Sequence, residues 1–199
     1  MRMPVGAVVT AVLLTVLPTM NAALAANTLN GAGASFPYPV YSAWAFEYNK
    51  VSGAQLNYQS IGSGGGIRQL SNQTVFFGAT DGPMTPEQMQ QAPGKILHLP
   101  TVLGAVVPIY NLPGTSGEIK FNGPVLADIF LGKITKWDDP AIAKLNSGMK
   151  LPSTDITVVH RSDGSGTSYI WVDYLAKVSP EWLKKVGVAT SVNWPVGLG

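Results

Sequence analysis

The sequence predicts an α/β protein with mainly parallel strands, arranged in two lobes. Segments with the apolar pattern of strands alternate along the chain with segments of helical periodicity, which is typical of parallel sheets. A long apolar run over residues 97–110 is interrupted by two prolines and by Gly104. These breaks predict extended segments that cross the molecule rather than one helix. We therefore expect the boundary between the lobes in this run, with residues 26–104 in the first lobe and residues 105–199 in the second.

The first predicted elements are a strand, a helix and a second strand. Residues 28–36 read as a short strand that runs into a turn of small residues. Pro37 favours a helix start, apolar side chains between Val40 and Tyr48 lie on one helical face, and Gly53 ends the helix. Residues 55–61 then predict the second strand, because apolar side chains alternate there and the segment ends in a β-branched residue.

The next predicted elements continue this alternation. The glycine-rich residues 63–66 indicate a turn, and a helix is expected to begin over residues 67–70. Residues 75–79 are apolar and predict a buried strand, and residues 85–87 (Thr-Pro-Glu) predict a capped helix start.

Helical and strand patterns return beyond the apolar run. Short helices are expected over residues 126–131 and 140–145. Residues 156–159 predict a strand that runs into the loop 160–167, and apolar residues between 170 and 178 predict the helix that follows.

Composition excludes several classes of protein. Charged residues make up 12% of the 199 residues, against roughly 25% in an average protein, and the net charge is only +2. The balance is too weak for a nucleic-acid binder that relies on bulk charge, and 46% hydrophobic residues are too many for a disordered chain. The sequence contains no cysteine, which excludes thiolate metal sites, disulfides and cysteine nucleophiles.

The N-terminus has the layout of a cleaved secretory signal peptide over residues 1–25. Arg2 is followed by an apolar stretch to Leu17, and Ala23-Leu24-Ala25 supplies the small residues of a cleavage site. The alternative is a membrane anchor, but the stretch is shorter than the ~20 residues that cross a bilayer. Because no cysteine is available to carry a lipid, we expect a free periplasmic protein without a lipid anchor.

Three turns share a composition suited to anions. Each of the segments 33–36, 62–66 and 163–167 follows a predicted strand, contains glycine and a hydroxyl residue, and precedes a predicted helix. Free backbone N–H groups at a helix start attract anions, glycine lets the backbone come close, and hydroxyls add donors. The alternative for each turn is an ordinary capped turn.

Five individual side chains have both a functional and a structural interpretation. Arg161 can pair with two oxygens of an anion and Asp163 can hold its guanidinium, although a plain surface ion pair is the alternative. Asp81 follows a predicted strand, with a simple turn residue as its alternative. His98 lies in an apolar run and is expected to be structural, whereas His160 could flank a site.

Known nucleotide and hydrolase motifs are absent from the sequence. It contains no P-loop and no G-x-S-x-G elbow. Ile67 stands where the third glycine of a dinucleotide-binding motif belongs.

Five motifs follow one another along the sequence: GAGASFP from Gly31, IGSGGG from Ile61, FGATD from Phe77, LGKITKWDD from Leu131 and RSDGSGTS from Arg161. From about residue 29 to residue 199, the chain resembles the periplasmic phosphate-binding protein family of phosphate-specific ABC importers. The resemblance implies a periplasmic-binding-protein-like (type II) α/β fold with two lobes, a hinge, and one phosphate enclosed between the lobes.

Carried over motif by motif, the resemblance implies a set of phosphate-binding residues. Hydroxyl or backbone donors are implied at Ser35, Phe36, Ser63, Ser165, Gly166 and Thr167. Arg161 would pair with the anion, with Asp163 as its support, and Asp81 would accept a hydrogen bond from a protonated phosphate oxygen. No catalytic residue, cofactor or metal is implied.

The same resemblance implies the protein's partners and completeness. It predicts a monomeric, non-enzymatic protein that delivers phosphate to an inner-membrane ABC permease and binds no nucleic acid. Family members are considerably longer and the chain stops in a Gly-x-Gly sequence, so we expect a C-terminally truncated second lobe. We expect the chain alone to be poorly folded or to bind phosphate weakly. The alternative functions are the binding of another oxyanion such as sulfate, and a phosphatase-like hydrolase.

Overall fold

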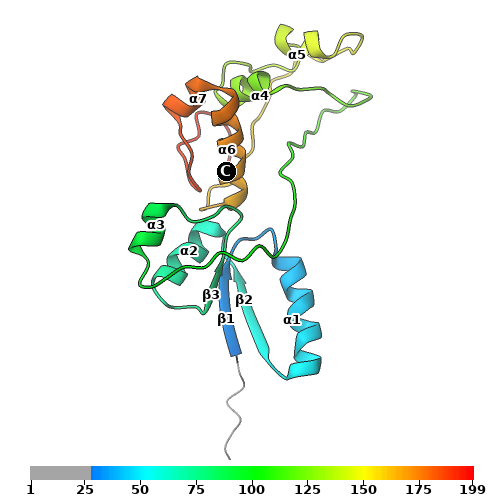
Figure 1. The fold of residues 1–199 in the computed structure, drawn as a ribbon. Helices are drawn as coiled ribbons and strands as arrows, with labels where there is room; N and C mark the ends of the chain where they lie inside the picture. The colour runs from blue at the N-terminus through cyan, green and yellow to red at the C-terminus, as the bar shows by residue number, and fades with distance from the viewer. Residues whose placement is uncertain (1–27) are drawn as a thin grey trace, which may run out of the picture.

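The computed structural model describes residues 28–199; the predicted signal segment over residues 1–25 lies outside them. Two bodies, residues 28–91 and residues 123–199, are joined by a long connecting segment (Figure 1). The predicted α/β class is confirmed, because a parallel sheet and its helices alternate along the first body.

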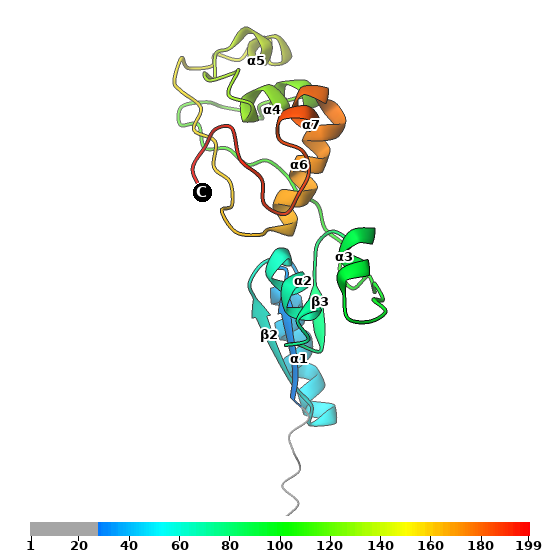
Figure 2. The same cartoon turned by 90° about the vertical axis from the view of Figure 1, so that its left-hand side faces the viewer.

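The first body is a three-stranded parallel sheet with a helix on each face. Its elements are β1 (Thr28–Gly33), α1 (Tyr38–Ser52), β2 (Gln55–Ser60), α2 (Ser63–Ser71), β3 (Phe77–Ala79) and α3 (Pro86–Gln91). The strand order is β2-β1-β3, and the register pairs Gly31 with Tyr58 on one side and with Phe77 on the other. Helices α1 and α2 lie on opposite faces of the sheet (Figures 1 and 2).

Residues at the helix ends account for the end of α1 and the start of α3, as the sequence predicted. Helix α1 ends where Gly53 adopts a left-handed conformation with φ of 70°, a geometry that glycine reaches at little cost. At the start of α3, Thr85 and Gln88 form a reciprocal capping box, in which each side chain accepts a hydrogen bond from the other residue's backbone N–H.

The glycine-rich stretch after β2 corrects the prediction of a turn over residues 63–66. The turn is formed by Gly62, which has a φ of 80°, and α2 begins at Ser63. Gly66 is helical and lies against β1, where an added Cβ would come within 2.5 Å of the Gly33 Cα. These glycines therefore let a helix approach the sheet closely instead of bending the chain.

Two predicted strands also need correction. The strand expected over residues 75–79 is shorter, since β3 begins at Phe77 and Phe76 is 71% exposed. The strand expected over residues 156–159 is wrong: within residues 28–199, Val159 forms only an isolated parallel bridge with Leu198. A strand is stable only where a neighbouring strand takes up its backbone groups, and a single bridge does not provide that.

The second body is built from helices around two apolar clusters. Its helices are α4 (Gly123–Phe130), α5 (Pro140–Leu145), α6 (Gly166–Val178) and α7 (Pro180–Lys185). The sequence reasoning missed α7, which Ser179 caps by accepting from the Trp182 N–H at 3.2 Å. One cluster centres on Ile129 and Ile142, and the other on Leu175 and Trp182.

Residues 92–122, hereafter the connecting segment, contain no helix or strand and run between the bodies as predicted (Figure 1). Leu103 is 98% exposed and Ile109 is 91% exposed, so this apolar run is not buried within residues 28–199. Gly104 lies in the segment, and a lobe boundary at that residue stays a prediction. None of the helices between residues 28 and 199 is long and apolar enough to cross a bilayer.

Candidate anion-binding site

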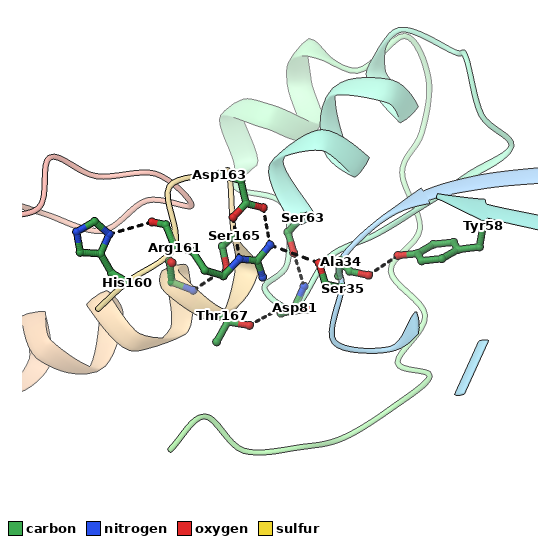
Figure 3. Close-up of polar contacts among 11 residues, drawn as sticks. Ala34, Ser35, Tyr58, Ser63, Asp81, His160, Arg161, Asp163, Ser165 and Thr167 are labelled. Carbon is green, nitrogen blue, oxygen red and sulfur yellow. Dashed lines mark hydrogen bonds and ion pairs between the residues drawn. The ribbon is translucent and has the colours of Figure 1, made fainter. Parts of the chain in front are cut away.

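Side chains from both bodies meet where the strands of the sheet end. Ser35 follows β1, Ser63 begins α2 directly after β2, and Asp81 follows β3. Because the three strands are parallel, these residues share one edge of the sheet. Across from them lies the segment of the second body that leads into α6, with Arg161 and Thr167 turned toward the first body (Figure 3).

Ser63 is fully buried and orients the loop that carries Asp81. The Asp81 backbone N–H donates to the Ser63 Oγ at 3.1 Å. Gly166, the first residue of α6, packs against both: an added Cβ would lie 2.2 Å from the Ser63 Oγ and 2.7 Å from the Asp81 Cβ. Only glycine at this position allows the start of α6 to reach the sheet edge.

Three hydrogen bonds connect the two bodies at this point. The Gly64 N–H donates to the Gly164 carbonyl at 2.8 Å. The Thr167 hydroxyl donates to the Asp81 Oδ2 at 3.3 Å, and the Arg161 Nη2 donates to the Ser35 Oγ at 3.4 Å. The last two bonds are long and therefore weak, so Arg161 and Asp81 each keep hydrogen-bonding capacity for another partner.

Arg161 and Asp163 form a two-point ion pair. The Arg161 Nε donates to the Asp163 Oδ1 at 2.7 Å, and the Nη2 donates to the Oδ2. These hydrogen bonds hold the pKa of the Asp163 carboxyl below its usual value. The guanidinium is thereby fixed in orientation, while 36% of the side chain stays accessible to solvent or to a ligand.

Asp81 is a half-buried carboxylate with unequal oxygens. Burial raises its pKa, and the Thr167 hydrogen bond and the Arg161 charge oppose that rise. Its Oδ2 accepts from Thr167, whereas its Oδ1 is buried and has no hydrogen-bond partner within residues 28–199. An acceptor left without a donor in the interior costs stability, so this carboxylate is kept at an energetic cost.

Helix α6 directs its N-terminus at the same place. Ser165 is fully buried and its Oγ accepts from the Ser168 N–H at 3.1 Å, which caps the helix. Its hydroxyl proton is free to donate elsewhere. The backbone N–H groups of Gly166 and Thr167 lie in the first turn, where helical geometry supplies no carbonyl partner.

The predicted residue Phe36 lies at the margin of this group. Its side chain is 45% exposed, and its ring packs on the connecting segment, where a Cβ on Gly104 would come within 2.3 Å of it. Only its backbone N–H is suited to the predicted donor role, since it directly follows Ser35 in the turn after β1.

The structure thus brings Ser35, Ser63, Asp81, Arg161, Asp163 and Thr167 together, with Ser165 and Gly166 at the start of α6. Arg161 and Thr167 also line a cavity of about 810 Å³ that continues toward Trp171 and Trp194 in the second body.

His98 makes a structural contact, whereas His160 lines the same cavity as Arg161 and Thr167. The His98 Nε2 accepts from the Met84 N–H at 3.1 Å, which fixes its tautomer and fits the expected structural role. His160 stacks on Trp194 with 4.6 Å between ring centroids and pairs its Nδ1 with the Arg161 carbonyl at 3.1 Å. Within residues 28–199, no group of three or more His, Cys, Asp or Glu side chains is placed to hold a metal ion.

Sequence reasoning missed the role of Tyr58. Its hydroxyl donates to the Ala34 carbonyl at 2.6 Å, directly before Ser35 (Figure 3). The alternation of β2 marks Tyr58 as an inward-facing residue, but nothing in the sequence identifies Ala34 as its partner.

Comparisons with known proteins place the chain in a family. A family model described as the PBP superfamily domain matches residues 19–192. The phosphate-binding protein PstS of Pasteurella multocida is 57% identical over 175 residues, which cover 87% of this chain and 50% of that protein. PstS of Haemophilus influenzae is 50% identical, with 87% and 52% covered. The chain therefore spans about half the length of these relatives.

Solved structures agree with this placement at the level of the fold. A phosphate ABC transporter substrate-binding protein of Clostridium perfringens, solved with bound phosphate, matches with a TM-score of 0.57 at 17% identity and covers 87% of this chain and 62% of its own. An ABC-type phosphate transport receptor of Vibrio cholerae matches with a TM-score of 0.52 at 15% identity, covering 86% and 62%. The chain belongs to the PBP superfamily, and within that family it is similar to the phosphate-binding PstS proteins.

Proposed function

We propose that this chain carries the phosphate-binding residues of an ABC-type importer and is not an enzyme. The proposal is supported by its identity of 57% to a phosphate-binding PstS protein and by the site at the sheet edge. The observation that carries the chemistry is Asp81, a half-buried carboxylate that accepts from the Thr167 hydroxyl and lies near the Arg161 charge and the N-terminus of α6.

The proposed site holds the anion mainly with neutral donors. The hydroxyls of Ser35, Ser63, Ser165 and Thr167, and the backbone N–H groups of Phe36, Gly166 and Thr167, surround the position, while Arg161 supplies one positive charge and Asp163 fixes it. Such an arrangement binds an oxyanion without a large basic surface, which agrees with a net charge of only +2.

Asp81 makes the site selective for phosphate over sulfate. Hydrogen phosphate has a proton to donate to the Asp81 carboxylate, whereas sulfate has none and would leave that carboxylate unpaired and facing a like charge. Sites built on such a hydrogen bond reject the analogue that lacks it by about 10⁴–10⁵-fold. The same reasoning disfavours the alternative of a sulfate-binding protein.

The proposed setting of this activity is the periplasm. We propose two lobes over residues 26–104 and 105–199, a cleaved signal peptide over residues 1–25, a monomeric state and delivery to an inner-membrane permease. The similarity to PstS proteins supports phosphate binding, whereas the signal peptide rests on the apolar N-terminal pattern and the lobe boundary on the apolar run over residues 97–110.

Calorimetric titration of the purified chain with phosphate, and competition with sulfate, test the proposal. We expect phosphate to bind, with sulfate competing only at far higher concentration. In Asp81→Asn the difference in affinity between the two anions is expected to narrow, while Glu47→Gln, at an exposed ion pair with Lys50, leaves it unchanged. Failure of phosphate to bind at millimolar concentration, or equal competition by sulfate, would overturn the proposal.

A further inference from the structure

Ala34 is held from both sides by the neighbouring strands. Its carbonyl accepts from the Tyr58 hydroxyl at 2.6 Å, and its N–H donates to the Ala79 carbonyl at 2.9 Å. The residue itself is only 1% exposed. The peptide that leads from Ala34 into Ser35 therefore cannot rotate freely.

The orientation of this peptide determines whether its carbonyl oxygen or its amide N–H faces a bound anion. In a trans peptide unit the C=O and the following N–H point in opposite directions, and residues 28–199 contain no cis peptide. With the Ala34 carbonyl turned to Tyr58, the Ser35 N–H points away from Tyr58. Figure 3 shows the Ser35 side chain on the Arg161 side and the Ala34 carbonyl on the Tyr58 side.

Tyr58 is itself held rigidly. Its ring stacks on Phe77 with 6.0 Å between centroids and meets the edge of Tyr41 at 5.1 Å. Burial, with smaller contributions from Tyr41 and Asp81, raises the pKa of the Tyr58 phenol well above its usual value. The hydroxyl therefore remains a donor over the whole physiological pH range.

We propose that Tyr58 is a positioning residue of the anion site: its hydroxyl holds the Ala34 carbonyl away from the anion, so that the Ser35 amide and hydroxyl face it. This inference rests on the proposed function. The physical reason is electrostatic, because a carbonyl oxygen directed at an anion would repel it, whereas the amide of the same peptide attracts it.

Removal of single hydroxyls from the same aromatic cluster tests the inference. Tyr58→Phe keeps the ring and removes only the donor, so we expect phosphate affinity to fall about 5- to 10-fold. The matched control is Tyr41→Phe, whose hydroxyl shares a hydrogen bond with Thr101 Oγ1 at 2.7 Å instead, and there we expect less than a twofold change. Equal affinities of Tyr58→Phe and the unsubstituted chain would contradict the inference.

A double-mutant cycle with Ser35→Ala separates positioning from a general loss of stability. If Tyr58 acts through Ser35, the effect of Ser35→Ala is smaller in the Tyr58→Phe background than in the unsubstituted chain. Strictly additive effects would overturn the inference. If the unsubstituted chain binds no phosphate, the proposed function fails, and amide hydrogen exchange at Ala34, whose N–H donates to the Ala79 carbonyl, decides the positioning. Exchange must accelerate in Tyr58→Phe and not in Tyr41→Phe, and an unchanged rate in Tyr58→Phe would refute it.

Discussion

Asp81 is subject to opposing influences within a few ångströms. Burial removes water from its carboxylate and raises its pKa, while the Thr167 hydroxyl and the Arg161 charge favour the ionised form. Its Oδ1 has no partner within residues 28–199. The carboxylate is thus kept at a cost in stability, which is typical of functional groups rather than of structural ones.

This cost predicts how stability depends on pH. Because the folded-state pKa of Asp81 is raised, its ionised form destabilises the fold above that pKa, and the penalty vanishes below the unfolded value of 3.8. We expect Asp81→Asn to raise the thermal midpoint at pH 7 and to bring little gain near pH 3. Thermal unfolding followed by circular dichroism at both pH values measures this. A gain of equal size at both would contradict the assignment.

Arg161 provides the site's positive charge. A hydrogen bond from a charged donor contributes about 1.5–3 kcal/mol, so Arg161→Ala is expected to weaken phosphate binding about 10- to 100-fold. Sulfate binding should weaken as well, because the guanidinium does not distinguish the two anions. The control is Lys136→Ala, which removes an exposed cation paired with Asp155. Equal loss in both variants, measured by calorimetry, would mean that only overall charge matters.

At the level of elements, the packing of α2 on the sheet brings Ser63 to the site. Helix α2 crosses β1 and β3 at a distance that only glycine allows, since a Cβ on Gly66 would lie 2.8 Å from the carbonyl oxygens of Ala32 and Ala79. These atoms belong to the backbone and cannot move aside as a flexible side chain would. The first turn of α2 is therefore held against the strand ends.

Gly66→Ala should consequently destabilise the first body. Overpacking of this kind costs about 1–3 kcal/mol in the free energy of unfolding, although alanine is the better helix former. Gly94→Ala is the matched control, because nothing lies within 4 Å of an added Cβ there and φ is ordinary. Urea unfolding of both variants gives the comparison, and equal midpoints would show that α2 is not packed as described.

At the scale of the whole molecule, the connecting segment is the least buried apolar part of the described chain. Leu97, Leu99, Leu103, Val107 and Ile109 are each at least 67% exposed. Exposed apolar surface of this extent favours association with other apolar groups. It contrasts with the two packed clusters of the second body, where Leu175 and Trp182 are fully buried.

Replacing Leu103 and Ile109 by serine should therefore leave the folded core intact. We expect the free energy of unfolding to change by less than about 0.5 kcal/mol, while binding of an apolar fluorescent dye falls. Leu175→Ala, a fully buried position, should instead cost about 2–5 kcal/mol. Loss of stability in the serine variant comparable to that of Leu175→Ala would show that the segment is buried.

The sequence by itself identified the candidate site residues and determined much of the local structure. Capping residues and periodicity predicted α1, α3 and α6, because these signals act between residues within one or two helical turns. The family motifs, similarly, named the hydroxyls, the arginine and the carboxylate that gather at the sheet edge.

Only the tertiary structure decided how these pieces meet. The bond from the Asp81 N–H to Ser63 and the contact of Tyr58 with Ala34 join residues that lie 18 or more positions apart. The strand expected over residues 156–159 does not form, because a strand depends on distant partners that local periodicity does not report. Local patterns identify which groups are present, whereas packing determines their orientation.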